Sequence, residues 1–96
     1  MDLYVIRRHG FESPEDLEAA AVRSTAEGDK PGSGVRWIRS YVVPEEDGKV
    51  GTVCIYQADS PETIRAHAAA SAMPADEIER VLDTVIVRPD PVAAKA

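Results

Sequence analysis

The sequence predicts a single α+β domain in which four strands and two helices follow one another in the order β-α-β-β-α-β. Short β-branched and aromatic runs, typical of strands, alternate with two segments whose apolar residues recur at helical spacing. The two helical segments also resemble each other, since residues 13–24 align without gaps on residues 60–71. A chain of 96 residues is long enough to enclose one such core.

The first strand and the first helix have clear local signals. Residues 3–7 read Leu-Tyr-Val-Ile-Arg, which favours a strand. Ser13 suits the N-cap of a helix, and Pro14 suits its first position because its missing N–H leaves no bond unmade there. The glycine-rich segment 28–34 ends this helix and forms a connection.

The second half of the chain repeats the scheme after a hairpin. Residues 35–43 and 50–58 are strand-like runs separated by a short acidic turn, so they predict a pair of antiparallel strands. Ser60 opens the second helix. The apolar run at residues 81–88 predicts the last strand.

This order of elements is that of the split β-α-β, or ferredoxin-like, fold. We therefore expect a four-stranded antiparallel sheet with both helices on one face. Because the other face would then be open, we also expect two copies to pair as a dimeric α/β barrel. The domain is predicted to span residues 1–90, with a flexible C-terminal tail at residues 91–96.

Composition excludes several classes of function. The formal net charge of −6 disfavours nucleic acid and anionic membranes as partners, since both bind cationic surfaces. The single cysteine, Cys54, excludes an internal disulfide and a CxxC zinc site. The sequence has no apolar run of membrane-spanning length and no signal-peptide pattern at its start, so we expect a cytoplasmic protein.

Alternation along the strands divides their side chains between two faces of the sheet. We predict that an aliphatic set receives the helices: Leu3, Val5, Ile38, Val42, Val53 and Ile55. The open face would then hold most of the aromatic side chains, in a set formed by Tyr4, Ile6, Arg8, Trp37, Arg39, Tyr41, Cys54 and Tyr56. An exposed face of this kind usually marks an interface or a ligand site, so we expect a homodimer through it.

The same face predicts a small-molecule pocket, because aromatic walls with a few polar groups are typical of such sites. We expect the pocket to be lined by Tyr4, Trp37, Arg39, Tyr41, Cys54, Tyr56 and His67. It would hold a small hydrophobic ligand. Alternatively, it would be the active site of a cofactor-free enzyme that protonates a flat apolar substrate, a hypothesis that rests on analogy of fold alone. A third hypothesis is an interaction module whose sheet face is filled by dimer contacts.

Several short motifs resemble a known family of small ferredoxin-like proteins, frequent in actinobacteria and mostly of unknown function, whose best-described type is a dimeric nickel-binding protein. The resemblance lies in Val-Arg-Trp-Ile-Arg-Ser-Tyr-Val at 35–42, Thr-Val-Cys-Ile-Tyr-Gln-Ala at 52–58, Ile-Arg-Ala-His at 64–67 and Met-Pro-Ala-Asp-Glu-Ile at 73–78. It covers roughly residues 3–90. The residues that match the family pattern are Trp37, Ser40, Tyr41, Cys54, Tyr56 and His67.

The resemblance implies a metal-binding homodimer that holds nickel or another divalent ion. The sequence departs from the family at Arg39, where members often have a histidine, and at Ala72, where they often have glycine. An arginine stays protonated and cannot replace an imidazole as a ligand. The expected metal ligands are therefore His9, Cys54 and His67, since imidazole and thiolate suit such ions.

Overall fold

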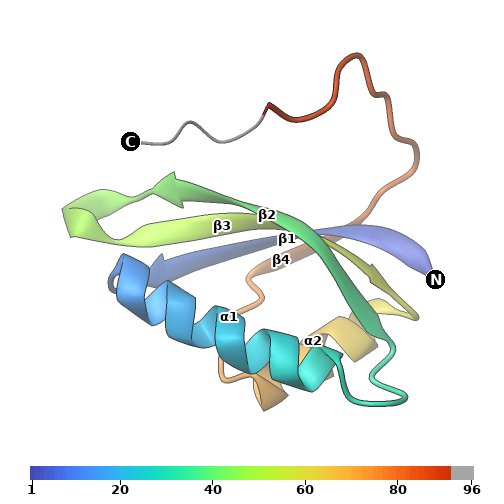
Figure 1. Cartoon of the computed structure of the whole chain (residues 1–96), viewed down its shortest axis with the longest axis horizontal. Helices are drawn as coiled ribbons and strands as arrows, with labels where there is room; N and C mark the ends of the chain where they lie inside the picture. The colour runs from blue at the N-terminus through green and yellow to red at the C-terminus, as the bar shows by residue number, and fades with distance from the viewer. Residues whose placement is uncertain (92–96) are drawn as a thin grey trace.

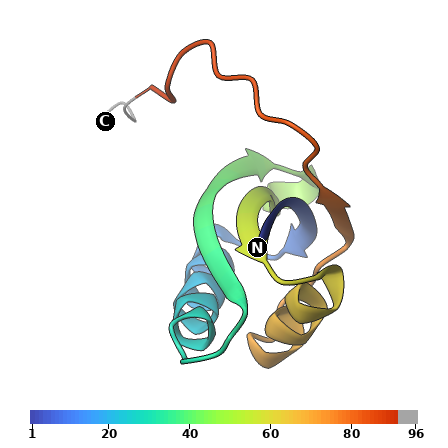
Figure 2. The same cartoon turned by 90° about the vertical axis from the view of Figure 1, so that its right-hand side faces the viewer.

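The structure is a computed structural model and describes residues 1–91. Four strands form one antiparallel sheet in the order β2-β3-β1-β4, and both helices cover the same face of it (Figures 1 and 2). The elements are β1 (Asp2–Phe11), α1 (Pro14–Gly28), β2 (Val35–Pro44), the short 3-10 helix η1 (Glu46–Gly48), β3 (Val50–Ala58), α2 (Pro61–Ala70) and β4 (Glu77–Arg80). The predicted ferredoxin-like α+β fold is confirmed.

Each helix begins where the sequence predicts it. Ser13 Oγ accepts a hydrogen bond from the backbone N–H of Asp16 at 3.2 Å, and Ser60 Oγ accepts one from the N–H of Thr63 at 3.1 Å. In both cases a proline follows the cap and an acidic residue lies in the first turn, where it favours the positive end of the helix dipole. The two helices therefore begin with the same N-cap arrangement.

The two faces of the sheet are inverted relative to the sequence-based prediction. The helix-facing core contains the set that was assigned to the open face, including Tyr4, Ile6, Arg8, Cys54 and Tyr56, all of them buried. The aliphatic set on β1 and β3 faces away from the helices and is half-buried: Leu3, Val5, Val53 and Ile55. The predicted open aromatic face was therefore wrong for these two strands.

The composition of the helices explains the inversion. The inner face of α1 offers small side chains, Ala20 and Ser24, and α2 offers Ala68 beside Ile64. Small helical residues leave space between the layers, and large side chains of the sheet occupy part of it. Burial under the helices also gives the phenol of Tyr56 a hydrogen-bond partner on α1, which an aliphatic side chain could not use.

An irregularity in β2 separates residues that simple alternation placed together. The pairing with β3 shifts between Trp37 and Arg39, so that Trp37 pairs with Tyr56 whereas Tyr41 pairs with Val53. A bulge of this kind moves the following side chains to the other face. Trp37 therefore lies on the helix side, and Tyr41 lies on the open side.

The last strand is shorter and earlier than predicted. β4 pairs antiparallel with β1, from Glu77 opposite Arg7 to Arg80 opposite Tyr4. The N–H of Val81 still bonds to the carbonyl of Leu3, but in this direction β1 has only one further residue, Asp2. The run 81–88 therefore passes beyond the partner strand, and its prediction as a strand was wrong.

Residues 81–91, here called the C-terminal arm, leave the sheet edge and curve over its open face (Figures 1 and 2). Asp90 connects the arm to β2. Its carboxylate accepts a 2.7 Å hydrogen bond from Tyr41 Oη and lies 3.5 Å from Arg39 Nε. The predicted domain 1–90 is thus one sheet with two helices and an arm. Of the predicted tail 91–96, only residue 91 lies within the described residues. Among the helices of residues 1–91, none has the length and apolarity needed to cross a membrane.

Candidate functional site

A cavity of about 800 Å³ lies between α1 and the helix-facing side of the sheet. One wall comes from α1, with Leu17, Ala21 and Ser24 among its residues, and the opposite wall comes from β1, β2 and β3. This volume is within the range of pockets that bind small organic molecules. The small side chains of α1 are what keep the space open.

Two aromatic rings form a flat part of the wall. Trp37 and Tyr56 stack with their ring centroids 5.9 Å apart and their planes 9° from parallel. Tyr56 is buried, whereas Trp37 is 37% exposed at the edge strand and carries the stack toward the surface. The cavity therefore offers a planar apolar surface.

A chain of polar groups continues inward from these rings. Ser24 Oγ lies 2.8 Å from Tyr56 Oη and 3.0 Å from His67 Nε2, so α1, β3 and α2 meet in one hydrogen-bonded group. Burial raises the pKa of the Tyr56 phenol, and the phenol is therefore protonated at neutral pH. Burial, together with the charge of Arg8, lowers the pKa of His67, so its imidazole is neutral there.

Arg8 places a positive charge at the base of this cavity. The side chain is 1% exposed, and its carbon Cζ lies 5.5 Å from the centroid of the Tyr56 ring. None of its three guanidinium nitrogens has a hydrogen-bond partner within the described chain. Residues 1–91 thus contain a buried guanidinium that lies over an aromatic face and forms no hydrogen bond to them.

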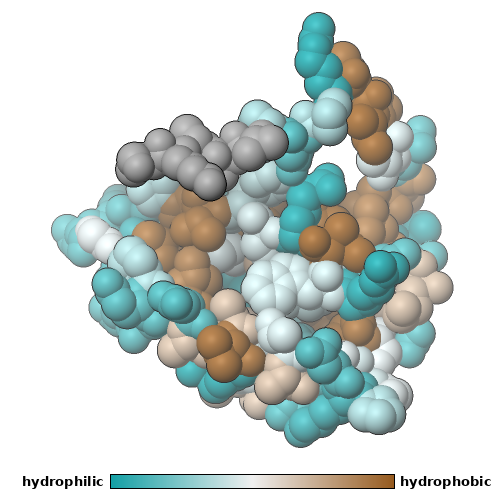
Figure 3. Space-filling model, viewed as in Figure 1, coloured by the Kyte–Doolittle hydropathy of each residue, from teal (hydrophilic) through white to brown (hydrophobic). Residues whose placement is uncertain are grey.

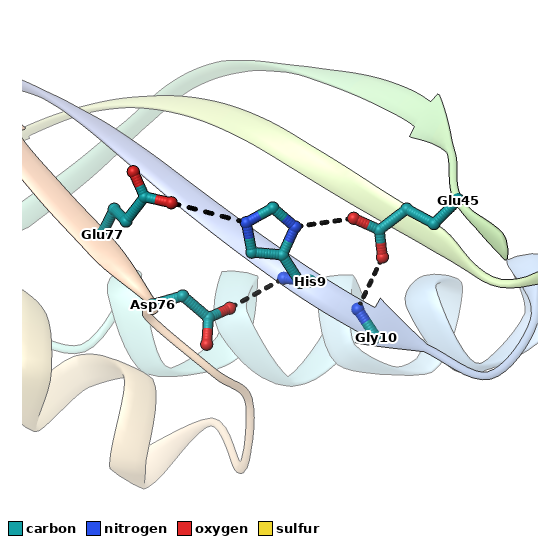
Figure 4. A network of polar contacts seen from close by, with 5 residues as sticks. All are labelled: His9, Gly10, Glu45, Asp76 and Glu77. Atoms are coloured by element: carbon teal, nitrogen blue, oxygen red, sulfur yellow. Dashed lines mark hydrogen bonds and ion pairs between the residues drawn. The ribbon is translucent and has the colours of Figure 1, made fainter.

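A second polar cluster surrounds His9 at the far end of β1 (Figure 4). Its Nδ1 lies 2.6 Å from a carboxylate oxygen of Glu45, and its Nε2 lies 3.6 Å from one of Glu77. Its backbone N–H donates to Asp76 at 2.8 Å. Two carboxylates, Glu45 and Glu77, therefore flank one exposed imidazole, and a third, Asp76, holds the backbone of the same residue.

The charges in this cluster reinforce one another. The hydrogen bond with Glu45 raises the pKa of His9, with smaller contributions from Glu77 and Asp76. The N–H of Gly10 donates to Glu45 at 2.8 Å and, with His9, lowers the pKa of the Glu45 carboxyl. The imidazole therefore holds a proton more firmly than a free histidine does, and any cation that binds here displaces that proton.

The structure does not bring the three expected metal ligands together. His9 lies in the exposed cluster, whereas Cys54 and His67 line the buried cavity, where Cys54 Sγ donates to Thr52 Oγ1 at 3.2 Å. Within residues 1–91 no three His, Cys, Asp or Glu side chains are grouped as a metal site would require. Near Cys54 and His67, the charge of Arg8 would also repel a cation.

The expected pocket residues do not all line the cavity. Five of the seven line the cavity: Trp37, Arg39, Cys54, Tyr56 and His67. Tyr4 is buried in the core instead, and Tyr41 bonds to the arm. Sequence reasoning missed Glu45 and Glu77 as partners of His9 and Ser24 as the link to His67, since no local spacing joins residues so far apart.

Comparisons with known proteins agree with this fold. A family model described as "Nickel responsive protein SCO4226-like" matches residues 4–81. The crystal structure of SCO4226 from Streptomyces coelicolor A3(2) is similar, with a TM-score of 0.69 and 20% sequence identity, over 86% of this chain and 99% of that chain. At this identity the likeness shows a common fold. None of the curated proteins compared with the chain matches it.

Proposed function

Because the chain belongs to the SCO4226-like family of nickel-responsive proteins, we propose that it is a cytoplasmic homodimer that binds nickel or a similar divalent ion through His9. The resemblance noted in the sequence is thereby confirmed at the level of the family. The single observation that supports His9 is its position between carboxylates on both ring nitrogens.

The chemistry of the His9 cluster fits such an ion. Imidazole nitrogen and carboxylate oxygen are donors that Ni²⁺ accepts, and the cluster is exposed, so an ion reaches it from solvent. One ring nitrogen of His9 would hold the ion together with the carboxylate beside it, Glu45 at Nδ1 or Glu77 at Nε2, and the remaining positions would be filled by water or by a second copy. Cys54 and His67 are not part of this proposal, because they lie beside the buried charge of Arg8.

The test is metal uptake by untagged protein in native mass spectrometry and calorimetry. We expect one Ni²⁺ per chain for the wild type and loss of this uptake in His9→Ala. His67→Gln is the matched control, since it alters the only other histidine, and we expect it to bind nickel as the wild type does. Uptake that survives in His9→Ala, or disappears in His67→Gln, would refute the assignment.

Support for the homodimer comes from the open face of the sheet. This face carries a half-buried aliphatic set on β1 and β3, and the arm beside it exposes Leu82, Val85, Ile86 and Val87, each at 74–84%. Figure 3 shows hydrophobic atoms of the arm standing clear of the body of the molecule. Exposed apolar surface on this scale in a chain of 10.4 kDa is typical of an interface.

Sedimentation analysis tests the dimer directly. The wild type should sediment with twice the chain mass of 10.4 kDa. Ile55→Lys places a charge in the middle of the open face and should yield a monomer with unchanged circular dichroism. A wild type that sediments as a monomer at all concentrations would contradict the proposal.

A further inference from the structure

Arg8 is the least expected group in the core. An arginine is charged at every accessible pH, and removing its charge from water is strongly unfavourable unless a partner compensates. Its side chain is buried, yet its three nitrogens have no hydrogen-bond partner within residues 1–91. Contact with the Tyr56 ring offsets only part of that cost.

The groups around Arg8 do not neutralise it. Glu18 and Asp29 also line the cavity, but both are exposed and neither forms an ion pair with Arg8. Ser24 and His67, which also line the cavity, are uncharged and bond to each other. A buried guanidinium whose N–H donors have no acceptor within residues 1–91 therefore borders a cavity of about 800 Å³.

We propose that this cavity binds a small organic carboxylate with a flat apolar body, and that Arg8 is the cation that recognises it. A carboxylate matches the planar fork of a guanidinium and would supply the missing acceptors. The stacked rings of Trp37 and Tyr56 offer a surface parallel to which a planar ligand lies. The site is separate from the His9 cluster, so it does not depend on nickel binding.

The alternative is that Arg8 is purely structural and is held by Tyr56 alone. The two cases differ in ligand selectivity, because only a recognition site prefers an anion to a neutral molecule of the same shape. Benzoate and benzamide form such a pair, since they share the ring and differ in charge. The experiment is calorimetry of the full chain with each compound in the presence of a chelator, which removes any effect of metal.

For the wild type we expect benzoate to bind at least about tenfold more tightly than benzamide, as expected for one charge-assisted contact. Arg8→Met keeps most of the volume and removes the charge. It should bind both compounds equally. Trp37→Ala is the matched control: it should weaken both compounds while the preference for benzoate is retained.

A second readout follows the neighbouring imidazole by NMR. Because the charge of Arg8 helps to lower the pKa of His67, saturation with benzoate should raise that pKa, whereas benzamide should leave it unchanged. Equal binding of the two compounds by the wild type, or a preference for benzoate that persists in Arg8→Met, would overturn the proposal. The wild-type comparison decides the question even if Arg8→Met fails to fold.

Discussion

At the scale of single residues, Gly51 leaves room for the carboxylate of Glu45 beside His9. A Cβ at this position would meet the carboxylate of Glu45 and approach the carbonyl of Arg8 within 2.8 Å. We therefore expect Gly51→Ala to displace Glu45 from the imidazole and to lower the pKa of His9 toward its ordinary value of about 6.5. An NMR titration of His9 in chelator-treated protein measures this change.

Glu45→Gln is the companion variant for this prediction. It removes the carboxylate without crowding, and it should lower the pKa of His9 in the same direction. The wild-type His9–Glu45 pair stabilises the fold at pH values above the lowered pKa of Glu45 and below the raised pKa of His9. A His9 pKa that is unchanged in both variants would show that Glu45 is not its main partner.

His67 makes a prediction of opposite sign. Its pKa is lowered in the folded protein by burial and by Arg8, so the unfolded chain binds a proton first as the pH falls below about 6.5. The wild type should therefore lose stability as the pH falls from about 6.5 to the lowered pKa of His67. His67→Gln should flatten this part of the curve, as measured by urea unfolding at several pH values, and an equally steep loss in the variant would contradict the assignment.

The sequence predicted which residues share a face of the sheet better than it predicted what each face contacts. Alternation correctly grouped Tyr4, Ile6, Cys54 and Tyr56 on one face, but both faces of β1 and β3 are apolar, so the pattern did not decide which face meets the helices. The small side chains on the inner face of α1 indicate which face that is, because they leave room for large side chains of the sheet. The contact of His9 with Glu45 joins residues 36 positions apart, and it depends on the path of β1 and on a glycine in β3.

At the scale of elements, the caps are the most predictable feature. Ser60 satisfies the N–H of Thr63 and begins α2, whose residue His67 belongs to the cavity. Ser60→Ala should lower the free energy of unfolding by about 1 kcal/mol, and Ser60→Asp should restore most of it. Urea unfolding measures both, and an unchanged midpoint in Ser60→Ala would show that the cap does not contribute.

The strands were predicted to within a few residues except for the last. Residues 35–43 and 50–58 correspond to β2 and β3 because their hairpin is a local signal. The position of β4 is set instead by where β1 begins, which no property of residues 81–88 reveals. A β-branched run forms a strand only where the edge of a neighbouring strand is available to it.

At the scale of the whole molecule, the arm is a run with strong strand character that pairs with no other strand of residues 1–91. It is fixed at Asp90 by Tyr41 and Arg39, and the apolar residues between Asp90 and β4 are exposed. If the proposed homodimer forms, this segment is the part of the open face that extends furthest and is free to pack on a second copy. The arm and the aliphatic face would then be buried together.

The double variant Val85→Asp with Val87→Asp tests this role. Both side chains are exposed on the arm, so two carboxylates there should prevent its burial against a second copy. We expect sedimentation to show a monomer, with the circular dichroism of the sheet and helices unchanged, because the arm lies outside the core. Val22→Asp makes the same chemical change at an exposed valine on α1 and should leave the dimer intact. A double variant that sediments like the wild type would exclude the arm from the interface and leave the aliphatic set on β1 and β3 as the surface to be tested.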